Sequence, residues 1–119
     1  MIRGIRGAIQ VSENEKLSIV SAADALMTSL IAANQILRAN VSAVFFTVTP
    51  DLNAAFPAAV RANLGWQTVP FLCGQEIPVA GALERVLRVL ILVETDLGQE
   101  QIQHIYLGGA ASLRPDLAS

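Results

Sequence analysis

The chain has 119 residues, of which 53% are hydrophobic and 15% are charged, and its formal net charge is −2. The length fits one domain, the charge offers no basic footprint for nucleic acid, and one cysteine excludes an internal disulfide. No apolar run reaches the roughly 20 residues of a membrane helix, and the N-terminus does not resemble a signal peptide. A cytoplasmic protein is therefore expected. The apolar surplus predicts an oligomer that buries surface between subunits.

The basic residues are almost all arginine. Lys16 is the one lysine, beside Arg3, Arg6, Arg38, Arg61, Arg85, Arg88 and Arg114. Arginine presents a planar fork that can grip a carboxylate with two hydrogen bonds. A genome rich in GC codons would produce the same bias, so both explanations stay open on this fact alone.

The first 40 residues predict a strand and then a long helix. "MIRGIRGAIQV" (1–11) is rich in isoleucine and predicts a strand. "SENE" has the capping-box form, with Ser12 three residues before Glu15. Apolar residues at helical spacing then predict a helix over about 13–39, closed by Asn40.

The middle of the chain predicts a strand, a short helix and a second strand. "SAVFFTVT" (42–49) is β-branched and aromatic, which is typical of a buried strand. "PAAVRANLG" (57–65) begins with proline and ends with glycine, as short helices do. "WQTVPFLC" (66–73) predicts a strand whose Pro70 belongs at a sheet edge or a bulge.

The apolar stretch "GALERVLRVLILVE" (81–94) carries both helical and strand features. Glu84 and Arg88 are spaced as a helix would use them, whereas Val, Ile and Leu fill both faces as in a buried strand. We predict a helical turn near Ala82–Arg85 and a strand over Val86–Glu94. In that strand one face carries Val86, Arg88, Leu90 and Leu92.

The last segment, "QHIYLGGAASL" (103–113), predicts a further strand with a glycine break, and 114–119 a polar tail. The resulting order β-α-β-α-β-β-β predicts one mixed α/β domain over residues 1–119.

Arg88 is the feature that most needs an explanation, because arginine keeps its charge and lies here in the most apolar stretch. Burying it unpaired would cost several kcal/mol. It reaches water, pairs with an acid of the chain, or binds an anion that is not part of the chain. The residues alone favour an internal pair, with Glu84, Glu94 or Glu76 as candidates.

Four blocks in order carry a family resemblance: "RGIRGA", "TPDLNAAFPA", "GWQTVPFLCGQEIPVAG" with "RVLRVLILVETD", and "HIYLGGAASLRPDL". Together they resemble the monofunctional, trimeric α/β class of chorismate mutases, over residues 2–117. The resemblance implies a mixed sheet with helices on one side, a homotrimer whose sheets form a central pseudo-barrel, and active sites at the subunit interfaces. It implies isomerisation of chorismate to prephenate in phenylalanine and tyrosine biosynthesis, with no cofactor.

The resemblance also implies roles for individual residues. Arg6 and Tyr106 would bind substrate carboxylates, and Arg88 would face the ether oxygen whose bond breaks. Cys73 and Glu76 would approach the ring hydroxyl. The remaining positions of the site would be Phe56 at the subunit boundary, Leu113 near the mouth, Phe71 and Leu72 as wall positions that contribute through their backbone, and Arg61 and Arg114 as outer positive charge.

The residues agree with such chemistry. A substrate with two carboxylates needs arginines. The rearrangement needs orientation and a fixed cation at the departing oxygen, and it needs no nucleophile or proton transfer. One departure is Ala59 in "FPAAVRANLGW", where the family usually has a lysine and a slightly longer helix, which affects the register of Arg61.

Other interpretations remain for single residues. Cys73 alone is most simply a small buried hydrophobe, and a thiol nucleophile with His104 has no supporting spacing. Arg3 and Arg85 are assigned to the surface or an interface. No cluster has the spacing of metal ligands, so no metal is expected. The alternative function is a non-catalytic trimer that binds a small carboxylate as a sensor or scaffold.

Overall fold

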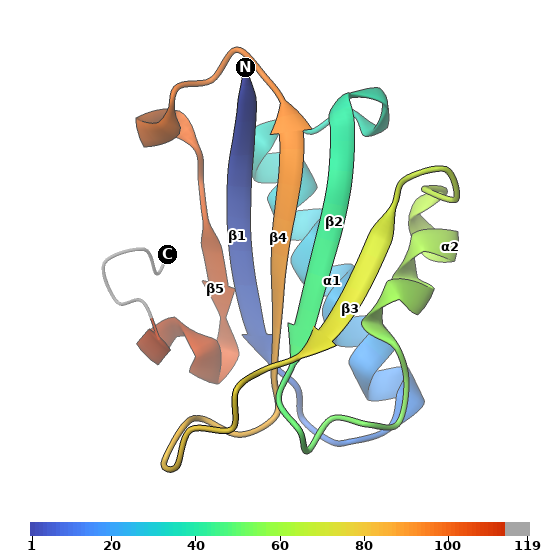
Figure 1. Ribbon diagram of the computed structural model, residues 1–119, viewed down its shortest axis with the longest axis vertical. Helices are drawn as coiled ribbons and strands as arrows, with labels where there is room; N and C mark the ends of the chain where they lie inside the picture. Colours follow the sequence, from blue (N-terminus) through green and yellow to red (C-terminus); the bar gives the residue numbers. More distant parts are fainter. Residues whose placement is uncertain (114–119) are drawn as a thin grey trace.

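The computed structural model describes residues 1–113, which form one mixed five-stranded sheet with helices on one face (Figure 1). The strands are β1 (Ile2–Gln10), β2 (Val41–Val48), β3 (Phe71–Gln75), β4 (Val86–Glu94) and β5 (Ile105–Leu107). The α-helices are α1 (Lys16–Asn34) and α2 (Val60–Leu64). Short 3₁₀ segments are η1 (Arg38–Asn40), η2 (Pro57–Ala59), η3 (Gln99–Gln101) and η4 (Gly108–Leu113). This order confirms the predicted mixed α/β fold.

Strand β4 lies in the middle of the sheet, whose order is β3-β2-β4-β1-β5. It pairs antiparallel with β1 and β2, while the edge strands β3 and β5 run parallel to their neighbours. The predicted bounds of β4 are confirmed. The most apolar stretch of the chain is central because a strand with neighbours on both sides offers little surface to water.

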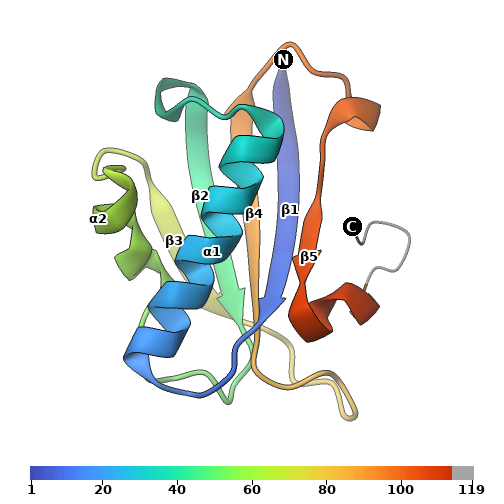
Figure 2. The same cartoon turned by 180° about the vertical axis from the view of Figure 1, so that it is seen from behind.

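Helix α1 crosses one face of the sheet and closes the core (Figure 2). Its buried stripe recurs at helical spacing: Ile19, Ala23, Leu26, Met27 and Leu30. Although α1 has the length and hydropathy of a membrane span, this stripe belongs to the hydrophobic core that α1 forms with the sheet.

The opposite face of the sheet is covered by neither α1 nor α2 (Figure 1). Among residues 1–113, the 3₁₀ segment η4 packs on one end of it, where Ala110 meets Ala8, Val86 and Tyr106. The strand register directs a largely apolar set of side chains to this open face: Ile2, Ala43, Phe45, Leu72, Leu90 and Leu92. Leu72 is 63% exposed and Ile2 is 48% exposed. A contiguous apolar surface of this kind is typical of an interaction site.

The predicted helix over 13–39 was too long at both ends. The helix begins at Lys16, and its N-cap residue Glu15 makes no capping hydrogen bond, so the capping-box prediction was wrong. Gln35 ends the helix in the left-handed conformation, at φ 53°. The chain turns there because Ile36 enters the core, whereas Leu37, which extended the apolar pattern, is exposed. Asn40 belongs to η1 and does not close the helix.

Two strand predictions were also too long. In 66–73, Trp66 and Val69 are buried within a turn after α2, and β3 begins only at Phe71. In 103–113, the strand ends at Leu107 because Gly108 adopts φ 58° and starts η4. β3 is an edge strand, the environment expected beside Pro70.

The helical turn predicted near Ala82–Arg85 was wrong. Arg85 adopts a positive φ of 51°, which no right-handed helix uses. The helix predicted over 57–65 is confirmed as η2 followed by α2, with Gly65 at φ 70° closing it.

Candidate active site

Arg88 lies on the open face, on the central strand β4 and toward one end of the sheet. Its neighbours across the sheet are Thr47 on β2 and Ala8 on β1, and its side chain is 40% exposed. The predicted face of β4 is confirmed, because Arg88 and Leu90 point away from the core while Val89 and Ile91 are buried in it. A stiff central strand therefore fixes the base of this guanidinium.

Glu76 pairs with Arg88. Arg88 Nε donates to Glu76 Oε2 over 2.7 Å, and the Glu76 side chain is 18% exposed. Thr47 Oγ1 donates to the same oxygen over 2.9 Å. Of the candidate partners from sequence, Glu76 is the one that the fold selects. Since the pair uses only Nε, and no other bond of Arg88 is present among residues 1–113, the terminal guanidinium nitrogens remain available for a ligand.

A cavity of about 380 Å³ lies beside Arg88 on the open face. Arg6, Arg88 and Tyr106 line it together with Phe45, Thr47 and Leu90. Arg6 neighbours Leu90 in the register, and Tyr106 neighbours Ala8. No carboxylate of residues 1–113 pairs with Arg6. The cavity thus joins two cationic side chains, a phenol and apolar walls.

A second cavity of about 300 Å³ lies at the end of the sheet and also includes Arg88. Its lining includes Glu76, Val86 and Leu113. Leu113, at the end of η4, packs with Leu83 on a small cluster around Ala8 and Tyr106. The structure therefore brings together Arg6, Glu76, Arg88, Tyr106 and Leu113 of the expected site.

The other expected residues lie elsewhere on the same chain. Cys73 pairs with Phe46 on the helix-covered face and packs against the core. Phe71 stacks near Phe46, with ring centroids 6.0 Å apart. Cys73 and Phe56 line a separate cavity of about 500 Å³, and Phe56 is 77% exposed. Within one chain these residues do not share a cavity with Arg88.

The remaining basic and wall positions are also apart from Arg88. Arg61 is exposed on α2, and Leu72 is exposed on the open face of β3. Arg114 lies outside the described residues. Sequence reasoning missed Thr47, which holds Glu76. The available signal was a threonine within the apolar run of β2, at an outward position next to Phe46.

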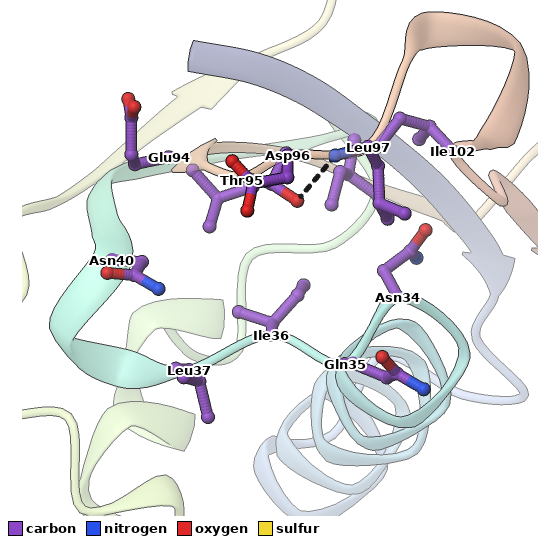
Figure 3. Close-up of a pocket in the computed structure, with 12 residues that line it drawn as sticks. Asn34, Gln35, Ile36, Leu37, Asn40, Glu94, Thr95, Asp96, Leu97 and Ile102 are labelled. Carbon is purple, nitrogen blue, oxygen red and sulfur yellow. Dashed lines mark hydrogen bonds between the residues drawn. The ribbon is translucent and has the colours of Figure 1, made fainter. Parts of the chain in front are cut away.

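A further cavity of about 380 Å³, shown in Figure 3, lies at the other end of the sheet. Its polar side chains are those of Asn34, Gln35, Asn40, Glu94, Thr95 and Asp96, and no arginine or lysine of residues 1–113 lines it. That electrostatic character disfavours an anion. Among residues 1–113, no group of three His, Cys, Asp or Glu side chains is arranged to hold a metal ion.

An open sheet face with two arginines, a tyrosine and apolar walls around one cavity defines a binding protein or enzyme for a small organic anion. Similarity to known proteins identifies one family within that class. The chain belongs to the chorismate mutase type I family, whose model matches residues 2–117. This confirms the resemblance carried by its four sequence blocks.

Individual relatives agree along the whole chain. It is 47% identical to the chorismate mutase AroH of Thermus thermophilus over 120 residues, which cover 100% of this chain and 98% of that protein. It is 44% identical to AroH of Bacillus subtilis, covering 99% and 94% respectively. A solved chorismate mutase from Clostridium thermocellum superposes with a TM-score of 0.91 at 39% identity, covering 92% of this chain and 98% of that one.

Proposed function

We propose that this protein is a chorismate mutase that isomerises chorismate to prephenate in aromatic amino-acid biosynthesis, acting in the cytoplasm as a homotrimer. The observation that carries the proposal is the placement of Arg88: central in the sheet, oriented by Glu76, and facing a cavity with Arg6 and Tyr106. Family membership supplies the substrate.

The reaction is an intramolecular Claisen rearrangement. The ether carbon–oxygen bond breaks while a new carbon–carbon bond forms, and negative charge builds on the departing oxygen. Arg88 is suited to stabilise that oxygen because its charge is permanent and its position is preset. No proton leaves the substrate, so the residues act by electrostatics and orientation.

The other residues of the cavity hold the substrate folded. Arg6 binds a carboxylate with its guanidinium, and the Tyr106 hydroxyl donates to a carboxylate. Glu76 uses Oε2 for Arg88 and Thr47, and Oε1 accepts from the ring hydroxyl. These contacts hold the side chain of the substrate over its ring. The reacting carbon atoms are then already oriented, which raises the rate.

The split of the expected residues supports an interfacial site. Arg6, Glu76, Arg88 and Tyr106 lie around one end of the open face, whereas Cys73 and Phe56 line another cavity. A neighbouring copy that covers the open face supplies Phe56, Arg61, Phe71, Leu72 and Cys73 to the Arg88 cavity. In a trimer with a three-fold axis, each Arg88 cavity meets the Phe56 and Cys73 region of the next copy. The same contacts bury the apolar open face.

Turnover of chorismate tests the proposal. Loss of its ultraviolet absorbance with formation of prephenate is expected for the wild-type protein and for Arg38→Gln, which removes an exposed arginine bonded to Gly65 O. Arg88→Gln should abolish most of the turnover. A folded wild-type protein that binds chorismate without converting it would instead support the sensor or scaffold.

A further inference from the structure

The chain enters β4 through a left-handed residue. Arg85 has φ 51°, a conformation that residues with a Cβ rarely adopt. Val11, just after β1, holds this residue twice: Val11 N donates to Arg85 O over 2.7 Å, and the Arg85 side chain donates from Nε to Val11 O over 2.9 Å. Arg85 is therefore a structural junction, although its side chain is 30% exposed and also pairs with Glu84 at the surface.

Asp51 holds the same junction from the β2 side. The Arg85 backbone N–H donates to both carboxylate oxygens of Asp51, over 3.0 and 3.2 Å. The Thr49 hydroxyl donates to Asp51 Oδ1 and accepts from the Val86 N–H over 3.0 Å. The two consecutive backbone N–H groups that lead into β4 are thus both fixed by this short segment after β2.

The junction lies between the two members of the ion pair along the chain. Residues 76–85 connect the edge strand β3 to the central strand β4 and pass the end of β2 (Figure 1). The start of this connection is held by Glu76 N, which donates to Val48 O over 2.9 Å. Its end is held by Asp51 through Arg85. The position of Glu76 relative to Arg88 depends on both anchors.

We propose that Asp51 is a positioning residue that keeps Arg85 in its left-handed conformation and thereby holds Arg88 against Glu76 for the rearrangement. The inference rests on the proposed function and adds a residue that acts through the pair. Asp51 lines the cavity that contains Glu76 and Arg88, but its oxygens are already engaged by Thr49 and Arg85. A displaced guanidinium mainly reduces stabilisation of the transition state.

Asp51→Asn tests the proposal, because it keeps the shape and replaces one acceptor oxygen with a donor. The kcat for chorismate should fall by roughly 10- to 100-fold with a smaller change in KM. Asp96→Asn, an exposed acid at the other end of the sheet, is the matched control and should leave both unchanged. In a Glu76→Gln background, Asp51→Asn should change kcat by less than about two-fold, because the pair is already broken. Multiplicative effects in the double variant would overturn the proposal.

A readout independent of turnover separates this inference from the proposed function. The Arg88 Nε–H signal in a ¹H–¹⁵N spectrum, identified by its absence in Arg88→Lys, should be protected in the wild type and lost in both Glu76→Gln and Asp51→Asn. An unchanged signal in folded Asp51→Asn would overturn the positioning role even if the enzyme is active. Absence of chorismate turnover in the wild type would refute the function while the spectrum still decides the role of Asp51.

Thr49→Val provides a milder variant if Asp51→Asn does not fold. It removes the hydroxyl that joins Asp51 to the Val86 N–H. We expect a kcat loss of roughly three- to ten-fold, with partial loss of the Arg88 Nε–H protection. Wild-type kcat and protection in this variant would contradict the proposal.

Discussion

Glu76 Oε2 accepts hydrogen bonds from Arg88 Nε, at 2.7 Å, and from Thr47 Oγ1, at 2.9 Å. The two ionised residues are 12 positions apart in sequence and meet because residues 76–85 fold back across the end of the sheet. The ion pair does not exclude a role for Arg88 in binding. It occupies only Nε, and the two terminal guanidinium nitrogens stay available to a ligand in the cavity. An internal partner and a ligand are thus compatible roles of one guanidinium.

Replacing Arg88 with its neutral isostere citrulline should lower kcat more than it raises KM. The charge acts on the departing oxygen, so its benefit appears in the transition state. Loss of one preorganised donor costs about 10²–10³ in rate, and loss of a full cation should reach or exceed that range. Lysine should rescue in part, because it lacks the fork. Steady-state kinetics decide this, and near-normal kcat in the citrulline protein would leave Arg88 as a structural ion pair.

Mixing inactive variants should report how the halves of the site are distributed. Arg6 and Arg88 line the same cavity of one chain, so Arg6→Ala and Arg88→Ala subunits should not restore activity when refolded together. Phe56 lies on the other half. Equal amounts of Arg88→Ala and Phe56→Asp subunits should therefore regain activity at about a quarter of the interfaces of a random trimer. Recovery in the first mixture and none in the second would contradict the division.

Glu76→Ala should reduce activity more than Cys73→Ser. Glu76 orients Arg88 directly, and breaking such a pair leaves the partner charge misplaced. Cys73 packs against the core and, in the proposed site, only bonds a hydroxyl, which serine can also do. We expect kcat/KM to fall by at least roughly 10²-fold for the alanine variant and by less than about ten-fold for the serine variant. Complete loss in a folded serine variant would reopen the thiol nucleophile.

Leu92→Glu should dissociate the oligomer and abolish activity while the subunit stays folded. Leu92 is a half-exposed residue on the open face, between Ala43 and Gly4 in the register. A carboxylate buried there between subunits would cost several kcal/mol. The matched control is Leu37→Glu, which changes an exposed leucine of the η1 region. Light scattering and circular dichroism measure assembly and folding; an active, trimeric Leu92→Glu protein would exclude the open face as the interface.

Chelators should leave activity unchanged. The reaction as proposed is driven by fixed side-chain charges, and the sequence offers no ligand set with metal spacing. Turnover measured after dialysis against EDTA, with and without added Mg²⁺, checks this. Loss of activity that Mg²⁺ restores would show that a cation takes part in binding or catalysis.

Local pattern was sufficient for the elements whose sequence and environment agree. The bounds of β4 followed from its run of Val, Ile and Leu, because a fully buried strand needs apolar residues on both faces. Proline and glycine marked the two ends of the α2 region. The family blocks predicted the fold, since they combine many positions at once, whereas the roles that they imply for single site residues stay predictions.

Only the tertiary structure decided where helix α1 stops, which acid meets Arg88, and which expected residues share a cavity. Gln35 and Arg85 take left-handed conformations that nothing in their side chains encodes; core entry of Ile36 and the bonds from Asp51 and Val11 impose them. Glu76, and not Glu84 or Glu94, pairs with Arg88 because residues 76–85 fold back across the end of β2. The sequence by itself determined a buried central strand that carries one permanent charge. The partner of that charge depended on long-range packing, because contacts between distant segments are set by the whole fold and not by local preference.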